Sequence, residues 1–242
     1  MKNEIKRPEV FIGKKAVNET QKLWYQDYIP YEKIKCITDI VPLPVCLMDD
    51  TSIITNDTLS HCVKEIYDFT GEGFISGDHG HHAAGIIADK IYGLFPNTKI
   101  GLFKVLRTNG TGRNAWLINA IDVAFKNNYQ VISASLGSDY PNSDLYSSLD
   151  KIQYSKNVSL KRYIKKLLGY KFTDKPIYFV SAAGNDSKDV DYPAAYGLPY
   201  ILSIGSAELV DGELRVAWYS SVGRITFCVP GSDILSSIMN NE

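Results

Sequence analysis

The sequence has few cysteines and none of the spacings that cysteine-based sites require. Its four cysteines include no C-x-x-C pair, which excludes a zinc ribbon and a dithiol redox motif: Cys36, Cys46, Cys62 and Cys228. It also lacks an excess of charge, because 26 Lys and Arg residues oppose 27 Asp and Glu residues, for a net charge of −1. This balance gives no reason to expect a nucleic acid as partner.

Long apolar runs are missing as well. No run approaches the roughly 20 residues of a membrane span, and the first ten residues, M-K-N-E-I-K-R-P-E-V, contain no apolar core of a secretory signal. We therefore expect a cytoplasmic protein with no membrane partner. The composition, 45% hydrophobic and 22% charged over 242 residues, is that of a globular protein, and the length suits one α/β domain with a sizeable core.

Short apolar runs alternate with helical patterns along most of the chain. Strands are expected at 34–41, 45–48, 63–69, 99–106, 131–135, 177–183, 200–205, 216–219 and 225–229. Apolar residues at 117, 120, 121, 124 and 125 keep the spacing of an amphipathic helix. Such alternation predicts an α/β fold in which a mostly parallel sheet carries helices on both faces, a three-layer α/β/α arrangement.

Two segments have a different character. Residues 1–33 are polar with interspersed aromatic residues, and we expect them to form an N-terminal arm on the surface of a domain that spans 34–242. The stretch from Leu145 to about Gly169 is rich in lysine, and we expect it to be helical with a break near Asn157.

The stretch D-H-G-H-H-A-A-G-I-I-A at 78–88 predicts a buried helix with histidines at its start. Asp78 is expected to be its N-cap. Three interpretations compete: surface histidines, a metal site of Asp78, His79, His81 and His82, or a catalytic base at His79. The metal site is the least favoured of the three, because His81 and His82 are adjacent and cannot both face one point on a helix.

A second stretch, P-V-C-L-M-D-D at 44–50, predicts a buried strand that ends on two carboxylates. Ligands of parallel α/β sheets bind at the carboxyl ends of the strands. Asp49 or Asp50 is therefore expected at the functional edge of the sheet, although a solvated loop would also accommodate this pair.

These and further stretches resemble motifs of the subtilisin-like serine proteases, the subtilases. His79–Gly85 resembles the family's H-G-T-H-V-A-G, and Val45–Thr51 resembles the strand that ends on the catalytic aspartate. Further landmarks follow in the family's order: S-L-G at 135–137, A-A-G-N at 182–185, Y-P-A at 192–194, Y-S-S-V-G at 219–223 and V-P-G at 229–231. The resemblance covers about residues 45 to 237.

The resemblance implies a peptide or protein substrate and the roles of individual residues. Asp49 would be the acid that orients the base His79, and Asn185 would donate to the oxyanion. Asp50 remains an alternative to Asp49, and Asp39 a more distant one. Two strand edges, Gly110-Thr111-Gly112 and Ser135-Leu136-Gly137, would pair with an extended peptide, and Ala182-Ala183-Gly184 would face the second edge across the pocket for the residue before the cut.

The sequence departs from the family at the nucleophile. No G-T-S-M-A occurs among the 242 residues, and Ser236 and Ser237 come too early for that motif. We therefore expect a subtilase domain truncated before its serine and inactive as it stands, with a pseudoprotease that binds peptides as the alternative. The oligomeric state is open. No cofactor is expected, and no metal, because the short segment 89–98 leaves no room for the calcium loop that many relatives carry.

Overall fold

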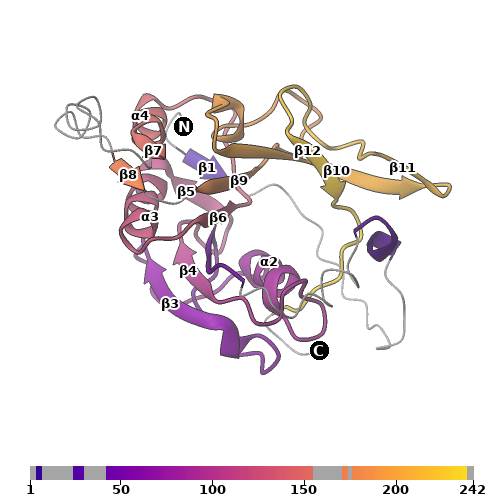
Figure 1. Cartoon of the computed structure of the whole chain (residues 1–242), viewed down its shortest axis with the longest axis horizontal. Coiled ribbons are helices and arrows are strands. Elements are labelled where there is room, and N and C mark those ends of the chain that lie inside the picture. Colours follow the sequence, from indigo (N-terminus) through magenta and orange to yellow (C-terminus); the bar gives the residue numbers. More distant parts are fainter. Residues whose placement is uncertain (1–3, 7–23, 30–41, 155–170, 174–175, 239–242) are drawn as a thin grey trace.

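A mostly parallel sheet runs through the middle of the molecule (Figure 1). The computed structural model of the chain describes residues 4–6, 24–29, 42–154, 171–173 and 176–238. Within these residues, eight strands form this sheet in the order β11-β10-β9-β6-β2-β4-β3, with β12 beside β10, and only the β10–β11 pair is antiparallel. The strands are β2 Val45–Asp49, β3 Val63–Asp68, β4 Ile100–Lys104, β6 Val131–Ala134, β9 Tyr178–Ala182, β10 Ile201–Val210, β11 Glu213–Val216 and β12 Phe227–Pro230.

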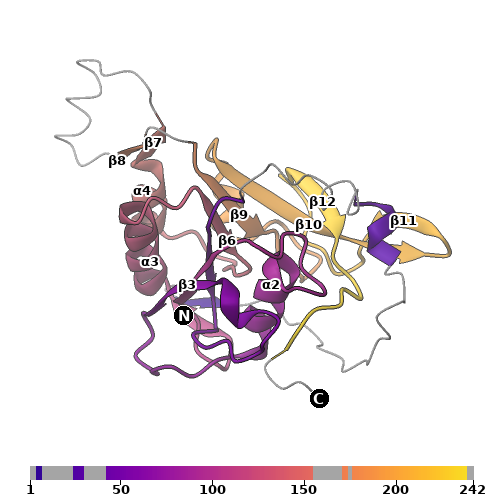
Figure 2. The same ribbon diagram turned by 60° about the horizontal axis from the view of Figure 1, so that its bottom comes forward.

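Helices cover both faces of this sheet, as Figure 2 shows. The helix α2, Asp78–Ala88, packs on one face, and α3, Asn114–Lys126, packs on the other with α4, Ser143–Asp150. Successive residues of β2 divide between the two layers, because Leu47 joins the core under α2 while Cys46 and Met48 join the core under α3. The predicted α/β fold with a mostly parallel sheet and three layers is confirmed.

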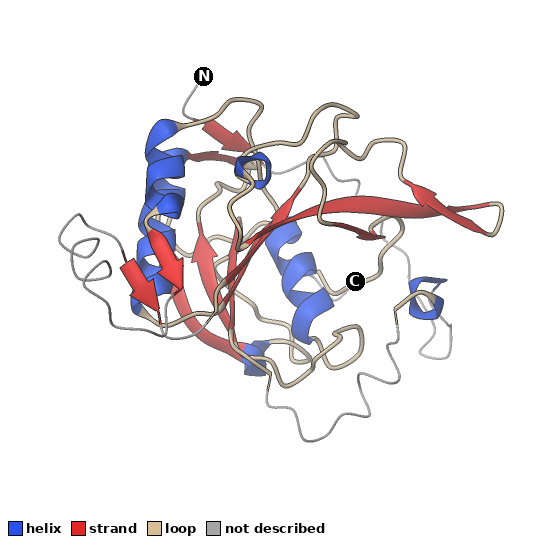
Figure 3. Ribbon diagram, turned by 45° about the horizontal axis from the view of Figure 1, so that its top comes forward, coloured by secondary structure: helices blue, strands red, loops and turns tan. Residues whose placement is uncertain are grey.

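Strand β2 is central because the strands that follow it in the sequence lie on both sides of it in the sheet. After β2 the chain forms β3 and β4 on one side, and it then crosses to β6 on the other side. The carboxyl end of such a strand is the usual ligand-binding position in an open α/β sheet. Figure 3 shows α2 lying against the middle of this sheet.

Shorter elements surround the sheet. They are the strands β1 Glu4–Lys6, β5 Thr111–Arg113, β7 Ile152–Tyr154 and β8 Lys171–Thr173 and the 3-10 helices η1 Trp24–Asp27, η2 Ser60–Cys62 and η3 Ala194–Tyr196. β1 pairs with β5, and β7 pairs with β8. None of the helices in the described part of the chain has the length and hydropathy needed to cross a membrane.

Several sequence-based expectations differ from this structure. The strand expected at 216–219 is not formed, because β11 ends at Val216 and Trp218 and Tyr219 lie in a turn. The helix expected to reach Gly169 ends at Asp150, since Ile152 is buried and starts a strand that pairs with Lys171–Thr173; long-range pairing overrides the local helical pattern. Of the arm expected at 1–33, the structure describes residues 4–6 and 24–29; within them Ile5 is not on the surface but 0% exposed and part of the main core. The strand expected at 34–41 lies outside the described residues, and so does Asp39.

Candidate active site

Asp49 and His79 form a hydrogen-bonded pair at the carboxyl end of β2. Asp49 is the last residue of β2 and is 0% exposed, and His79 lies in the first turn of α2. The imidazole Nδ1 lies 2.8 Å from Asp49 Oδ1, and that oxygen also accepts the backbone N–H of Asp50 at 2.8 Å. Since a carboxylate only accepts, Nδ1 carries the proton and Nε2 is the nitrogen left to act as a base.

Asp50, the alternative acid, has a different partner. Its Oδ1 accepts the backbone N–H of Gly80 at 2.8 Å, so it satisfies an N-terminal amide of α2 from a neighbouring strand. Gly77, not Asp78 as expected, is the N-cap, and it makes no side-chain cap bond. A methyl group on Gly77 would lie 2.1 Å from Asp50 Oδ2, so this contact requires glycine. Asp50 therefore fixes the start of the helix that carries His79.

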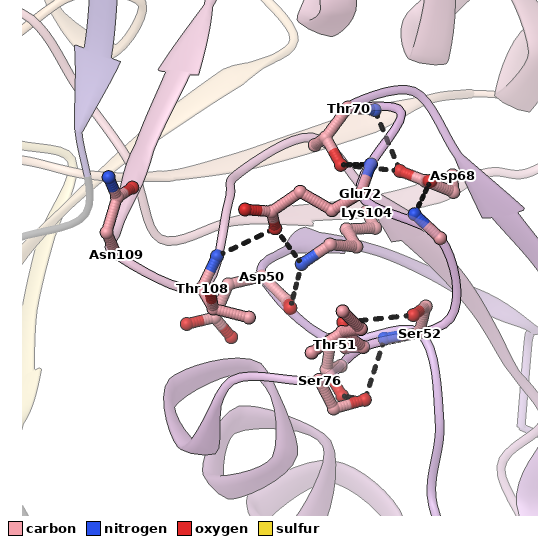
Figure 4. A network of polar contacts seen from close by, with 12 residues as sticks. Asp50, Thr51, Ser52, Asp68, Thr70, Glu72, Ser76, Lys104, Thr108 and Asn109 are labelled. Atoms are coloured by element: carbon pink, nitrogen blue, oxygen red, sulfur yellow. Dashed lines mark hydrogen bonds and ion pairs between the residues drawn. The ribbon is translucent and has the colours of Figure 1, made fainter.

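A buried lysine holds the backbone beside this pair (Figure 4). Lys104 is 0% exposed; its Nζ donates to the Asp50 carbonyl at 2.9 Å and lies 3.2 Å from Glu72 Oε2. Glu72 in turn accepts the backbone N–H of Thr108 at 3.0 Å. The charge of Lys104 is thus paired, and two loops are tied to the end of β2.

Hydroxyl groups complete the loop that follows β2. Ser76 Oγ accepts the hydroxyl of Thr51 at 3.0 Å and the backbone N–H of Ser52 at 3.1 Å, as Figure 4 also shows. The segment just before α2 is therefore fastened to the segment just after β2. Both ends of the Asp49–His79 pair are held in place by these contacts.

The histidines of α2 do not converge on one point. His81 is 0% exposed and neither of its ring nitrogens has a hydrogen-bond partner among the described residues, whereas His82 Nε2 donates to the Ile234 carbonyl at 3.0 Å. The metal set proposed from the sequence is therefore not assembled. A different group, Asp49, Asp50 and His79, has ligand atoms within 4.8 Å of one another, but the contacts above already engage an atom of each.

Burial lowers the pKa of His81, against the opposing effect of the carboxylates of Asp78 and Asp89. Burial likewise lowers the pKa of His82, and its bond to the Ile234 carbonyl works in the other direction. Both imidazoles are thus held in the neutral form. Neither side chain offers a charge to a ligand at neutral pH.

The two strand edges expected to bind a peptide are joined by residues of the chain itself. Ile5 stands opposite Gly112 and Lys6 opposite Thr111 in an antiparallel pair, and Lys6 also pairs with Gly137. The Lys6 N–H donates to the Gly137 carbonyl at 2.8 Å, and the Gly137 N–H donates to the Lys6 carbonyl at 2.8 Å. An extended segment therefore adds a strand between the edges at 110–112 and 135–137.

The side chain of Ile5 enters the apolar core between these edges. A methyl group on Gly112 would lie 2.8 Å from Ile5 Cγ1 and 2.8 Å from Leu106 Cδ2, so the absence of a side chain there admits Ile5. Leu136, on the opposite edge, is also buried in this core. The position that Ile5 fills accepts an aliphatic side chain.

The segment 182–185 begins at the last residue of β9, which lies beside β6 in the sheet. Ser181 pairs with Ala134, so Ala182-Ala183-Gly184 runs next to Ser135-Leu136-Gly137 at the carboxyl edge. Gly184 has a φ of +111°, which favours glycine, and Asn185 follows it half-buried. Asn185 therefore lies at the carboxyl edge of the same sheet as Asp49, where a donor to an oxyanion would be needed.

Three features of the site were not expected from the sequence. They are the role of Asp50 at the start of α2, the strand Glu4–Lys6 between the two edges, and Asp191, whose backbone N–H donates to the Ala183 carbonyl at 2.8 Å. Burial, helped by the carboxylates of Asp139 and Asp186, raises the pKa of Asp191 to about 6. Asp191 directly precedes the Y-P-A landmark, and this position was its only signal in the sequence. The role of Asp50 and the strand Glu4–Lys6 depend on contacts between distant segments.

Comparisons with known proteins point to one family. A sequence model of the subtilase family (Peptidase_S8) matches residues 21–238. The subtilase-type proteinase psp3 of Schizosaccharomyces pombe is 29% identical over 177 residues, which are 69% of this chain and 34% of the relative. Subtilisin NAT of Bacillus subtilis subsp. natto is 30% identical over 171 residues, 66% of this chain and 38% of the relative.

The fold is shared with solved structures too. A cold adapted subtilisin-like serine proteinase superposes with a TM-score of 0.63 at 22% identity, covering 81% of this chain and 66% of that one. The chain spans little more than a third of the length of the two curated relatives described above, 34% and 38%. With the family model matched over most of its length, the chain belongs to the subtilase family of serine-type endopeptidases.

Proposed function

We propose that these residues supply the acid, the base, the oxyanion donor and the substrate-binding edges of a subtilisin-like serine endopeptidase. The observation that carries the proposal is the 2.8 Å bond between the buried Asp49 carboxylate and His79 Nδ1 at the carboxyl end of the central strand. Such a pair orients an imidazole and stabilises its protonated form. It is the arrangement that serine proteases use to activate a hydroxyl.

In the proposed reaction, His79 Nε2 takes the proton of a serine hydroxyl as its oxygen attacks the peptide carbonyl. Asp49 stabilises the imidazolium that forms, and the amide of Asn185 donates to the developing oxyanion. His79 then gives the proton to the leaving amine when the C–N bond breaks, and water later releases the acyl group by the reverse sequence. The edges at 111–113 and 137, which Glu4–Lys6 occupies in this structure, would hold the substrate extended once that segment is displaced.

We further propose that none of the 242 residues is the nucleophile. No G-T-S-M-A motif occurs among them. Ser236, the first of two late candidates, donates its hydroxyl to the His82 carbonyl at 2.7 Å. Ser236 and Ser237 both lie against Gly85, which is six residues beyond His79 on α2 and so about 9 Å further along the helix axis. These contacts hold both hydroxyls away from the start of the helix.

The second candidate function is peptide binding without cleavage. It is favoured by Glu4–Lys6, which pairs with both edges and needs no serine to do so. A pseudoprotease would retain the edges and the buried position of Ile5. The two candidates differ in whether the Asp49–His79 pair has a hydroxyl to act on.

A fluorogenic peptide assay on three proteins separates these candidates. They are the chain itself, the chain extended after residue 238 with the serine-bearing C-terminal segment of a subtilisin, and the His79→Ala variant of the extended chain. We expect turnover only in the extended chain and a loss of several orders of magnitude in His79→Ala, because the serine then lacks its base. Circular dichroism checks that all three are folded.

The remaining outcomes each decide something. Turnover in the unextended chain would show that one of its own hydroxyls, such as that of Ser236 or Ser237, is the nucleophile. A folded extended chain without turnover would favour the pseudoprotease. Turnover that survives His79→Ala would contradict the role proposed for His79.

A further inference from the structure

Asp191 lies between the two segments that follow β6 and β9. Its own N–H donates to the Ala183 carbonyl at 2.8 Å, and the N–H of the next residue, Tyr192, donates to the Ser138 carbonyl at 3.0 Å. Ser138 and Tyr192 form an antiparallel bridge. The backbone at Asp191 is thus fixed to both segments and spans the space between them.

The carboxylate of Asp191 touches both segments at their glycines. A methyl group on Gly137 would lie 2.9 Å from Asp191 Oδ2, and one on Gly184 would lie 2.7 Å from the same oxygen. Any side chain at either position would displace the carboxylate. Because Gly137 and Gly184 carry no side chains, the Asp191 carboxylate can lie against both segments. We call Asp191 together with Ser221 the Asp191 site.

Ser221 adds a buried hydroxyl that is without a partner. Its Oγ lies 2.7 Å from the methyl position on Gly184, the same distance as Asp191 Oδ2. Ser221 is 1% exposed, and its Oγ makes no hydrogen bond to any residue that the structure describes. A buried hydroxyl of this kind costs stability unless a ligand or water bonds to it.

The surroundings of the Asp191 site are acidic. Asp139 and Asp186 are close enough to raise the pKa of Asp191 further after burial has raised it. Lys188 is exposed and lies 3.6 Å from Asp139 Oδ1 and 3.5 Å from Asp186 Oδ2. Lys188 therefore forms its ion pairs with these two rim carboxylates; it also lowers the pKa of Asp191, but by less than burial and the two carboxylates raise it.

We propose that the Asp191 site binds the basic side chain, arginine or lysine, of a peptide seated between the two edges. The inference rests on the proposed function, because it takes the peptide to lie where Glu4–Lys6 lies. Asp191 accepts hydrogen bonds from the cation, and Ser221 accepts one more. An aliphatic side chain would leave both groups without partners, and an acidic one would be repelled. Asp191 is thus a specificity-determining residue.

The register of Glu4–Lys6 shows which peptide residue reaches the site. Lys6 stands opposite Gly137 in an antiparallel bridge. In a peptide bound in the same register, the residue two places after the one that takes the position of Lys6 stands opposite Ser135. That position lies beside Ala182-Ala183-Gly184, because β6 and β9 are neighbours. The probe is therefore fluorescein-Glu-Ile-Lys-Ala-Arg-amide, with citrulline or Glu in place of Arg as matched probes.

Fluorescence anisotropy measures binding of the three probes to the full chain at pH 8 and low salt. Two substitutions weaken the pairing of the chain's own strand Glu4–Lys6, which lies where the probe is expected to bind. Lys6→Pro removes the N–H that donates to the Gly137 carbonyl, and Ile5→Ala removes the buried side chain of that strand. We expect the Arg probe to bind about tenfold more tightly than the isosteric neutral citrulline probe, as for one hydrogen bond to a charged group. The Glu probe should bind least.

Asp191→Asn should abolish this preference with little change in citrulline binding, since it keeps the shape of the side chain. Asp139→Asn is the matched control on the exposed rim, and it should keep most of the preference. Equal binding of Arg and citrulline probes by the Lys6→Pro and Ile5→Ala chains would overturn the inference and leave the proposed function standing. A preference that depends on Asp139 and survives Asp191→Asn would also overturn it. Binding of no probe to folded Lys6→Pro or Ile5→Ala chains would overturn the proposed peptide site itself.

Discussion

At the residue scale, the adjacent carboxylates of Asp49 and Asp50 have separate tasks. Strand alternation separates them, because Asp49 shares the side of β2 on which Leu47 packs under α2. Asp49 thus accepts a hydrogen bond from the His79 ring, and Asp50, one residue later, accepts one from the backbone N–H of Gly80. A subtilase with a residue other than aspartate at position 50 would need another acceptor for that N–H.

Asp50→Ala should lower the free energy of unfolding by about 1–2 kcal/mol, the usual cost of losing a helix N-terminal acceptor. The reason is that the Gly80 N–H, buried beside Asp49, then has no carboxylate to donate to. Urea unfolding followed by circular dichroism measures the change. The exposed Asp57 is the control, and Asp57→Ala should change the stability by less than about 0.5 kcal/mol. Equal stability of Asp50→Ala and the parent chain would contradict this role.

The preference of the Asp191 site should depend on pH. Burial and the carboxylates of Asp139 and Asp186 raise the pKa of Asp191 to about 6, and Lys188 opposes this shift. Below that pH the carboxyl is protonated and neutral, so the tighter binding of the Arg probe should decline between about pH 7 and pH 5. A bound cation favours the charged form and moves the decline to lower pH. Anisotropy titrations at several pH values test this, and the Asp191→Asn chain should show a flat profile.

At the element scale, the sequence predicted an element correctly where the residues that form it lie in one continuous stretch, and failed where the element depends on a distant partner. The helix expected at 78–88 and the structure's α2 coincide, since its small apolar residues and histidines lie in one continuous stretch. The helix expected to reach Gly169 ends at Asp150, because Ile152 starts a strand that pairs with Lys171–Thr173; residues 155–169 lie outside the described part of the chain. Periodicity within a stretch does not report such partners.

The strand β1 shows the same limit more strongly. Glu4–Lys6 is three residues long and polar at both ends, and nothing local marks it as a strand. Its partners, Thr111–Arg113 and Gly137, lie more than 100 residues away in the sequence. The family motifs located those two edges, but only the structure shows a segment of the chain between them.

Ile5→Ala should loosen this strand. Removing a buried aliphatic side chain commonly costs about 2–5 kcal/mol, and Ile5 is the fully buried residue of β1. The amide of Gly137, which donates to Lys6, should then exchange its hydrogen at least about tenfold faster. Hydrogen–deuterium exchange measures this against the Ala183 amide, which donates to Ile204 inside the sheet. Equal acceleration at both amides would indicate global destabilisation and contradict a local release.

At the scale of the whole molecule, segments from the two ends of the described chain meet. Trp24 Nε1 donates to the Ser232 carbonyl at 3.2 Å, and the Tyr25 hydroxyl donates to the Leu235 carbonyl at 3.4 Å. The segment 234–236 also contacts α2 through His82. The helix that carries His79 is therefore covered by late residues of the chain, and its buried histidines affect the stability of the whole fold.

The fold should lose stability as the pH falls from about 7 to 5. Burial lowers the pKa of His81 and of His82 in the folded state below the unfolded value of about 6.5. At a pH between the folded and the unfolded pKa, the unfolded chain therefore binds more protons than the folded chain. The stability that these two groups contribute is complete above the unfolded pKa and is lost as the pH falls below it. Asp191, whose pKa is raised, acts in the opposite direction over about pH 4–6.

His81→Leu isolates the contribution of the more buried imidazole. Both ring nitrogens of His81 are buried without partners among the described residues, and a leucine removes them along with the titrating group. We expect the variant to lose less stability than the parent chain between pH 7 and pH 5, measured by urea unfolding at each pH, while Asp78, Asp89 and His82 remain unchanged around it. The exposed His61 is the control, and His61→Gln should follow the parent chain. An identical pH dependence of His81→Leu and the parent would show that protonation of His81 is not linked to unfolding.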